Sequence, residues 1–112
     1  MIFKDYRMPE TQKEKYVLAI QAAKEVAKRG TIKKEDHKAL IKFLSDIGEE
    51  AKLVFLRSIP METSYNLTID KDFLHSEPIR NMIDKSRKGE FSGKLKELVE
   101  GKIVINEEGE EV

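Results

Sequence analysis

The stretch from residue 10 to residue 29, ETQKEKYVLAIQAAKEVAKR, constrains the fold more than any other part of this sequence. Apolar side chains recur in it at intervals of three and four residues, which is the spacing of one face of an α-helix. Thr11 and Glu14 have the spacing of a capping box, in which each side chain binds a backbone N–H of the first turn. Gly30 follows two basic residues, as is typical of a helix end. A helix with so wide an apolar face needs neighbouring helices to cover it.

Four further segments have helical periodicity. Gly48 separates two of them, and Asp46 with Glu49 repeats the capping-box spacing at the start of the later one. Pro60 ends that helix, because a residue before proline is pushed out of the helical region. The short connections predict a bundle. The four segments are residues 33–47, 49–59, 78–88 and 92–100.

Two segments of the C-terminal half have β-strand character. Residues 64–69, SYNLTI, alternate apolar and polar side chains, which is the period of a half-buried strand. Residues 102–105 are rich in β-branched side chains, and the following NEEGEE could turn the chain back onto Val112.

We therefore expect a mainly α-helical domain of about five helices, with a minor antiparallel β-element in its C-terminal half. The length of 112 residues suits one domain that folds without disulfides or metals. We assign residues 1–105 to this single helical domain and residues 106–112 to an acidic C-terminal tail or hairpin end.

The composition excludes several classes of protein. The absence of cysteine removes disulfides, thiolate metal sites and cysteine nucleophiles together. No apolar run approaches 18 residues, and the start of the chain has no stretch of signal-peptide length, so we expect a cytoplasmic protein without a membrane span. Charged residues make up 38% of the chain, mostly Lys and Glu, a bias that is typical of thermophile proteins.

The net charge is zero, but the charge is unevenly distributed. Residues 1–60 contain 13 Lys or Arg against 9 acidic residues, which gives +4, and residues 61–112 contain 8 against 12, which gives −4. Four acidic residues lie within the last six positions, so the rest of the chain has a net charge of +4. This is a modest basic character, not that of a strongly basic nucleic-acid-binding domain.

The sequence contains no complete catalytic or metal-binding motif. Three carboxylates gather around His75, but the spacing does not fit an EF-hand loop, and helix capping explains them better. His37 follows Asp36 on a helix, where adjacent side chains do not face each other, so we interpret it as a partly buried structural histidine. The three carboxylates near His75 belong to Asp70, Asp72 and Glu77. We therefore expect no catalytic residues, no metal and no cofactor.

The segment Gly89 to Leu95 superficially suggests a phosphate-binding loop. Such a loop needs four residues between its glycines and a Ser or Thr after its Lys, which holds magnesium. Here three residues separate Gly89 from Gly93, and Leu95 follows Lys94. We interpret Gly89 as the end of one helix and Ser92 as the cap of the next.

A nucleic-acid-binding function is the alternative hypothesis. The order of elements from residue 49 onward resembles that of winged-helix proteins, although no family motif supports the resemblance. A winged-helix-like domain in this chain would use four cationic side chains that phosphates could contact. The short last helix offers no Arg, Asn or Gln for reading bases, and the wing would be acidic. The four residues are Arg87, Lys88, Lys94 and Lys96.

Our leading hypothesis is a non-enzymatic protein-interaction module, such as an adaptor, an assembly subunit or a regulator, that self-associates. The first helix has more apolar surface than one bundle seam requires. Tyr16, Val17 and Leu18 are consecutive there, so we expect part of this run to bind a protein partner or a second copy.

Overall fold

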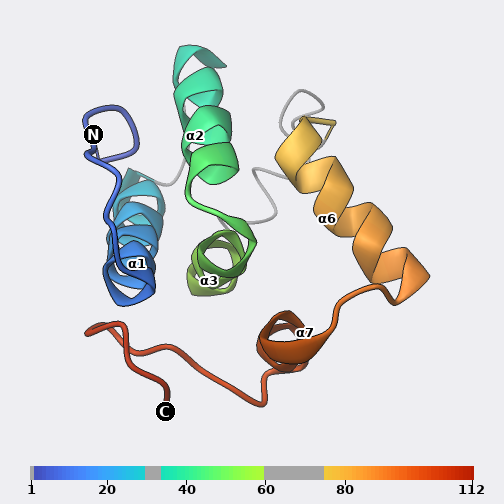
Figure 1. The fold of residues 1–112 in the computed structure, drawn as a ribbon. Coiled ribbons are helices and arrows are strands. Elements are labelled where there is room, and N and C mark those ends of the chain that lie inside the picture. Colours follow the sequence, from blue (N-terminus) through green and yellow to red (C-terminus); the bar gives the residue numbers. More distant parts are fainter. Residues whose placement is uncertain (1, 30–33, 60–74) are drawn as a thin grey trace.

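The described part of the chain folds into a bundle of five α-helices (Figure 1). The structure is a computed structural model, and it describes residues 2–29, 34–59 and 75–112. All five predicted helices are present, with ends within two residues of those expected from the sequence. They are α1 (Gln12–Arg29), α2 (Lys34–Asp46), α3 (Glu49–Ser58), α6 (Glu77–Lys88) and α7 (Gly93–Glu100).

The helix ends agree with the sequence signals in part. The backbone N–H of Glu14 donates to Oγ1 of Thr11 at 3.2 Å, which is one half of the predicted capping box. The capping box predicted for α3 is wrong, because Gly48 occupies the N-cap position and no side chain caps the helix. Asp46 instead accepts a hydrogen bond of 2.8 Å from the hydroxyl of Tyr6.

Gly89 ends α6 as predicted. Its φ of 65° lies in the left-handed region, where glycine carries no steric penalty, and its backbone N–H closes the last turn. Ser92 occupies the N-cap position of α7, but its side chain makes no cap hydrogen bond there. The predicted position is therefore correct, whereas the predicted hydrogen bond is absent.

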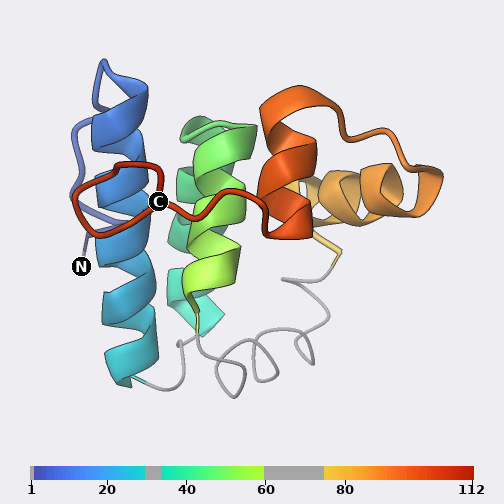
Figure 2. The same ribbon diagram turned by 90° about the horizontal axis from the view of Figure 1, so that it is seen from below.

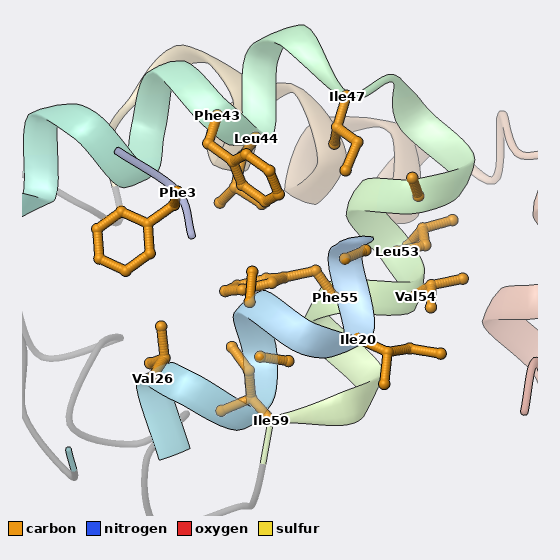
Figure 3. Close-up of a cluster of buried hydrophobic side chains, with 14 of the residues drawn as sticks. Phe3, Ile20, Val26, Phe43, Leu44, Ile47, Leu53, Val54, Phe55 and Ile59 are labelled. Atoms are coloured by element: carbon orange, nitrogen blue, oxygen red, sulfur yellow. The ribbon is translucent and has the colours of Figure 1, made fainter. Parts of the chain in front are cut away.

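The core is centred on α3, which contacts α1, α2 and α7. Phe55 and Phe43 are fully buried and pack edge to face, with ring centroids 6.4 Å apart. Phe3, which precedes the first helix, is buried in the same cluster (Figure 3). Five consecutive residues of α3 are buried, so this helix is surrounded by protein on most of its circumference.

The strand predicted at residues 102–105 does not form. The backbone N–H groups of Lys102 and Ile103 both donate to the carbonyl oxygen of Glu97, at 2.9 and 3.4 Å. These donors close the end of α7 and are not available to a sheet. Within the described residues only an isolated antiparallel bridge, between Ile105 and Glu111, has β geometry. The strand predicted at residues 64–69 lies outside the described residues.

The chain ends in a hairpin, which we define as residues 104–112 and call the C-terminal hairpin. Its turn is organised by Asn106, whose side-chain oxygen accepts from the N–H groups of Glu108 and Glu110 at 3.0 and 2.9 Å. The N–H of Val112 donates to the carbonyl of Val104 at 2.8 Å. The hairpin crosses α3 and reaches α1 on the other side of the bundle (Figure 2). Among the described helices, none is long and apolar enough to span a bilayer.

Candidate functional site

A groove lies between α3, α7 and the C-terminal hairpin. It has a volume of about 230 Å³, and five of its seven lining residues are aliphatic. Two buried residues on neighbouring helices, Val54 and Leu98, form part of its wall. The lining residues are Val54, Arg57, Ser58, Leu98, Ile103, Val104 and Ile105.

Two apolar side chains of the hairpin are mostly exposed, and one of them, Val104, lines this groove. Val104 is 56% exposed and Val112 is 80% exposed, and they are the large hydrophobic residues left mostly exposed in the described part of the chain. The hydrogen bond that joins them places them directly opposite each other across the hairpin, so both side chains lie on one face of it. Ile105 points the other way and packs against the core. The hairpin thus presents a valine pair to solvent.

Arg57 holds one side of the groove in place. Its Nη1 donates to the carbonyl oxygen of Val99 at 2.7 Å, in the last turn of α7. A cation at this end of a helix is favourable, because the unpaired carbonyls carry partial negative charge. The same side chain therefore joins α3 to α7 and gives the groove a positive edge.

The predicted partner surface is divided by the fold. Tyr16 is 3% exposed, and its hydroxyl donates to Oε2 of Glu50 at 2.8 Å. Burial is the main cause that raises the pKa of Tyr16, and the hydrogen bond to Glu50 adds to it. Leu18 is half-buried against the core, and Val17 is half-buried close to Gly109 of the hairpin. Tyr16 therefore packs in the interior and is not available to a partner, and the hairpin lies over Val17.

The four cations predicted to contact nucleic acid have different surroundings. Nζ of Lys94 lies 2.6 Å from Oε1 of Glu111 and 5.4 Å from the ring centre of Tyr16. Glu111 is the main cause that raises the pKa of Lys94. Lys96 is 4.0 Å from Glu100 within the same helix. The other two cations, Arg87 and Lys88, are exposed in the last turn of α6.

The acidic residues of the hairpin contact lysines from two helices. Glu110 pairs with Lys13 of α1 at 3.2 Å, and Glu107 pairs with Lys24 of the same helix. With the Lys94–Glu111 pair, these contacts hold the hairpin against the bundle. Sequence reasoning missed this docking, although the opposite net charges of the tail and the rest of the chain were a signal for it.

The groups considered for catalysis or metal binding do not form a site in the described residues. His37 is 6% exposed, more deeply buried than predicted, and the neighbouring Asp36 pairs with Lys4. His75 is exposed. Two of the carboxylates predicted near it, those of Asp70 and Asp72, lie outside the described residues, and the third, Glu77, is exposed at the start of α6. No cluster of metal-ligating side chains occurs in the part of the chain described.

Lys52 is a buried cation in the middle of α3. It is 6% exposed, and its Nζ donates to the carbonyl oxygen of Pro78 at 3.1 Å, which links α3 to the first turn of α6. Burial is the main cause that lowers its pKa below the ordinary value of 10.5; Glu49 opposes this effect and Lys85 reinforces it.

We expect Lys52 to make the protein more stable as the pH rises in the alkaline range. Between its lowered folded-state pKa and 10.5, the unfolded chain binds more protons at this residue, so the free energy of unfolding increases with pH. Urea denaturation at a series of pH values from about 7 to 10.5 measures this slope. Lys52→Met should reduce the slope, whereas Lys38→Met, at an exposed position of α2, should not. Equal slopes in wild type and Lys52→Met would contradict the prediction.

Comparisons of the chain with protein-family models, with curated proteins and with solved structures return no match, so the fold and the surfaces described above are the basis for inferring its function.

Proposed function

We propose that this protein is a non-enzymatic interaction module that self-associates through the groove and the valine pair beside it. The observation that carries the proposal is the position of two mostly exposed apolar side chains: Val104 lines the groove, and Val112 lies opposite Val104 in the hairpin. Exposed apolar surface next to a groove is characteristic of protein interaction sites. The described residues offer no comparable arrangement for acid–base chemistry.

A second copy is the partner that best fits this surface. In a two-fold interface the same patch occurs on both subunits, so it must contain both a projection and a hollow that receives it. Val112 supplies the projection and the groove supplies the hollow.

We expect wild-type protein to form a dimer and the double variant Val104→Glu, Val112→Glu to be monomeric. Two carboxylates in an apolar contact would be desolvated without partners, which strongly disfavours association. Sedimentation equilibrium over a range of concentrations measures the change.

The matched control is Gln21→Glu with Asn81→Glu, which adds the same charge at exposed positions of α1 and α6 and should leave the dimer intact. A wild type that stays monomeric at all concentrations would refute self-association. A dimer that persists in the valine double variant would show that another surface is responsible.

A winged-helix-like DNA-binding regulator that uses residues 87–96 is the alternative. The exposure of Arg87 and Lys88 favours it. It is less well supported, because the strand predicted at residues 102–105 does not form and the residues of the predicted wing fold back onto α1.

A further inference from the structure

A row of lysines runs along one face of α1. Lys13, Lys24 and Lys28 are separated by intervals of 11 and 4 residues, which returns each side chain to the same side of an α-helix. At 1.5 Å per residue the row is about 22 Å long. Val17 lies between Lys13 and Lys24 on this face. We call these three lysines the lysine row.

The C-terminal hairpin crosses α1 (Figure 2) and contacts two of the three lysines of the row. Glu110 pairs with Lys13 and Glu107 with Lys24. Gly109, which lies between Glu107 and Glu110 in the hairpin turn, is buried, and its φ is +80°. A Cβ at Gly109 would lie 2.6 Å from the backbone oxygen of Lys13 and 3.0 Å from Cγ2 of Val17, so a side chain there would push the hairpin away from α1.

The hairpin is held on the row by interactions that a competitor can replace. The side chains of Lys13 and Glu110 are 59% and 60% exposed, and those of Lys24 and Glu107 are 58% and 71% exposed. Ion pairs this exposed contribute little to stability and are weakened by salt. Lys94, at the neighbouring end of α7, is held by Glu111 in a partly exposed pair as well. An external polyanion could therefore take the place of all three carboxylates.

We propose that the lysine row, together with Lys94, is a binding surface for the phosphate backbone of nucleic acid and that the C-terminal hairpin covers it. The hairpin carboxylates occupy the positions that phosphates would take, so the closed protein binds nucleic acid weakly and the open protein binds it well. The surface is distinct from the groove and goes beyond self-association.

The chemistry of the row favours a nucleic acid over an acidic protein. A protein partner needs apolar anchors at the centre of its interface, and the apolar side chains on this face are not free to serve as such: Val17 is half-buried next to Gly109 and Ile20 is buried in the core. Phosphate contacts require only cations, because the binding is driven by the release of counterions. The row contains lysine and no arginine or asparagine, so binding should not depend on the base sequence.

The test compares two triple variants by the fluorescence anisotropy of a labelled DNA duplex at low salt. The open variant removes the hairpin carboxylates, and the charge control removes three exposed carboxylates from the N-terminal segment, α2 and α6, so that both gain the same net charge. Circular dichroism checks that both are folded. The open variant is Glu107→Gln, Glu110→Gln, Glu111→Gln, and the charge control is Asp5→Asn, Glu35→Gln, Asp84→Asn.

We expect the open variant to bind the duplex at least tenfold more tightly than the charge control. Each phosphate contact adds about 0.9 to the slope of log K against log salt, so three freed lysines should steepen it by about three relative to wild type. Gly109→Ala, which leaves the charge unchanged, should also increase affinity because it displaces the hairpin. Equal binding by the open variant and the charge control would overturn the proposal, as would an unchanged affinity in Gly109→Ala.

The location of the site is tested in the open variant. Changing the three row lysines to Gln should abolish the gain in affinity. Changing Lys38, Arg87 and Lys88 to Gln removes the same charge elsewhere and should preserve it. The reverse result would show that nucleic acid binds at Lys38, Arg87 and Lys88 instead of at the lysine row, and would overturn the proposal. Equally tight binding of a polyglutamate chain would identify an acidic protein as the ligand and overturn it too.

Discussion

Replacing Phe55 with alanine should lower the free energy of unfolding by about 3–5 kcal/mol, the largest effect that we expect from a single substitution in this protein. Phe55 is fully buried near the middle of α3, the helix that contacts α1, α2 and α7. Its removal leaves a cavity and also breaks the edge-to-face contact with Phe43, which contributes beyond simple burial. Urea denaturation followed by circular dichroism measures the loss.

The matched control is Phe91→Ala. Phe91 lies in the connection between α6 and α7, is only half-buried and is outside the core cluster. Its replacement should cost less than about 1 kcal/mol, as is usual for a position that is not packed in a core. Similar losses at the two positions would contradict the assignment of α3 as the centre of the core.

The helices were predictable because the signals that define them are local. Apolar periodicity, the Thr11 cap and the Gly89 stop act within one or two turns, and the structure uses each of them. The strand at residues 102–105 was not predictable in this way. Its β-branched composition favours a strand, but its first amide groups close the end of α7, and nothing in the local pattern indicates that Glu97 will accept from them.

The surfaces were harder to predict than the helices, because they depend on residues far apart in the sequence. Lys13 and Glu110 are 97 positions apart and Lys24 and Glu107 are 83 apart, yet both pairs form. Composition indicated that the tail and the rest of the chain carry opposite charge, but not which lysines the tail would contact. The apolar run of α1 likewise did not reveal that Tyr16 would bind Glu50 in the interior.

The C-terminal hairpin belongs to both of the surfaces that we propose. One face presents Val104 and Val112 beside the groove, and its turn holds the lysine row through Glu107 and Glu110. Its position depends in turn on α7, because the residues that lead into it are hydrogen-bonded to the end of that helix. The attachment of α7 to the bundle therefore helps to determine where the hairpin lies in both proposals.

Replacing Leu98 with alanine should detach α7 and the hairpin from the bundle. α7 has eight residues, too few for an isolated helix to be stable in water, so it depends on packing against α3. Leu98 is the residue of α7 that is buried in the core, at 1% exposure. We expect a loss of about 2–5 kcal/mol, as for other buried leucines. Amide hydrogen exchange should show the greatest loss of protection in α7 and the hairpin.

Leu95→Ala is the matched control, because Leu95 lies on the same helix but is only partly buried. It removes the same atoms and should cost less, since fewer contacts are lost at a partly exposed position. Equal loss of protection in α1, α3 and α7 of the Leu98 variant would contradict local detachment and show that the helices open as one unit. Undiminished protection in α7 would mean that Arg57, through Val99, is sufficient to hold it.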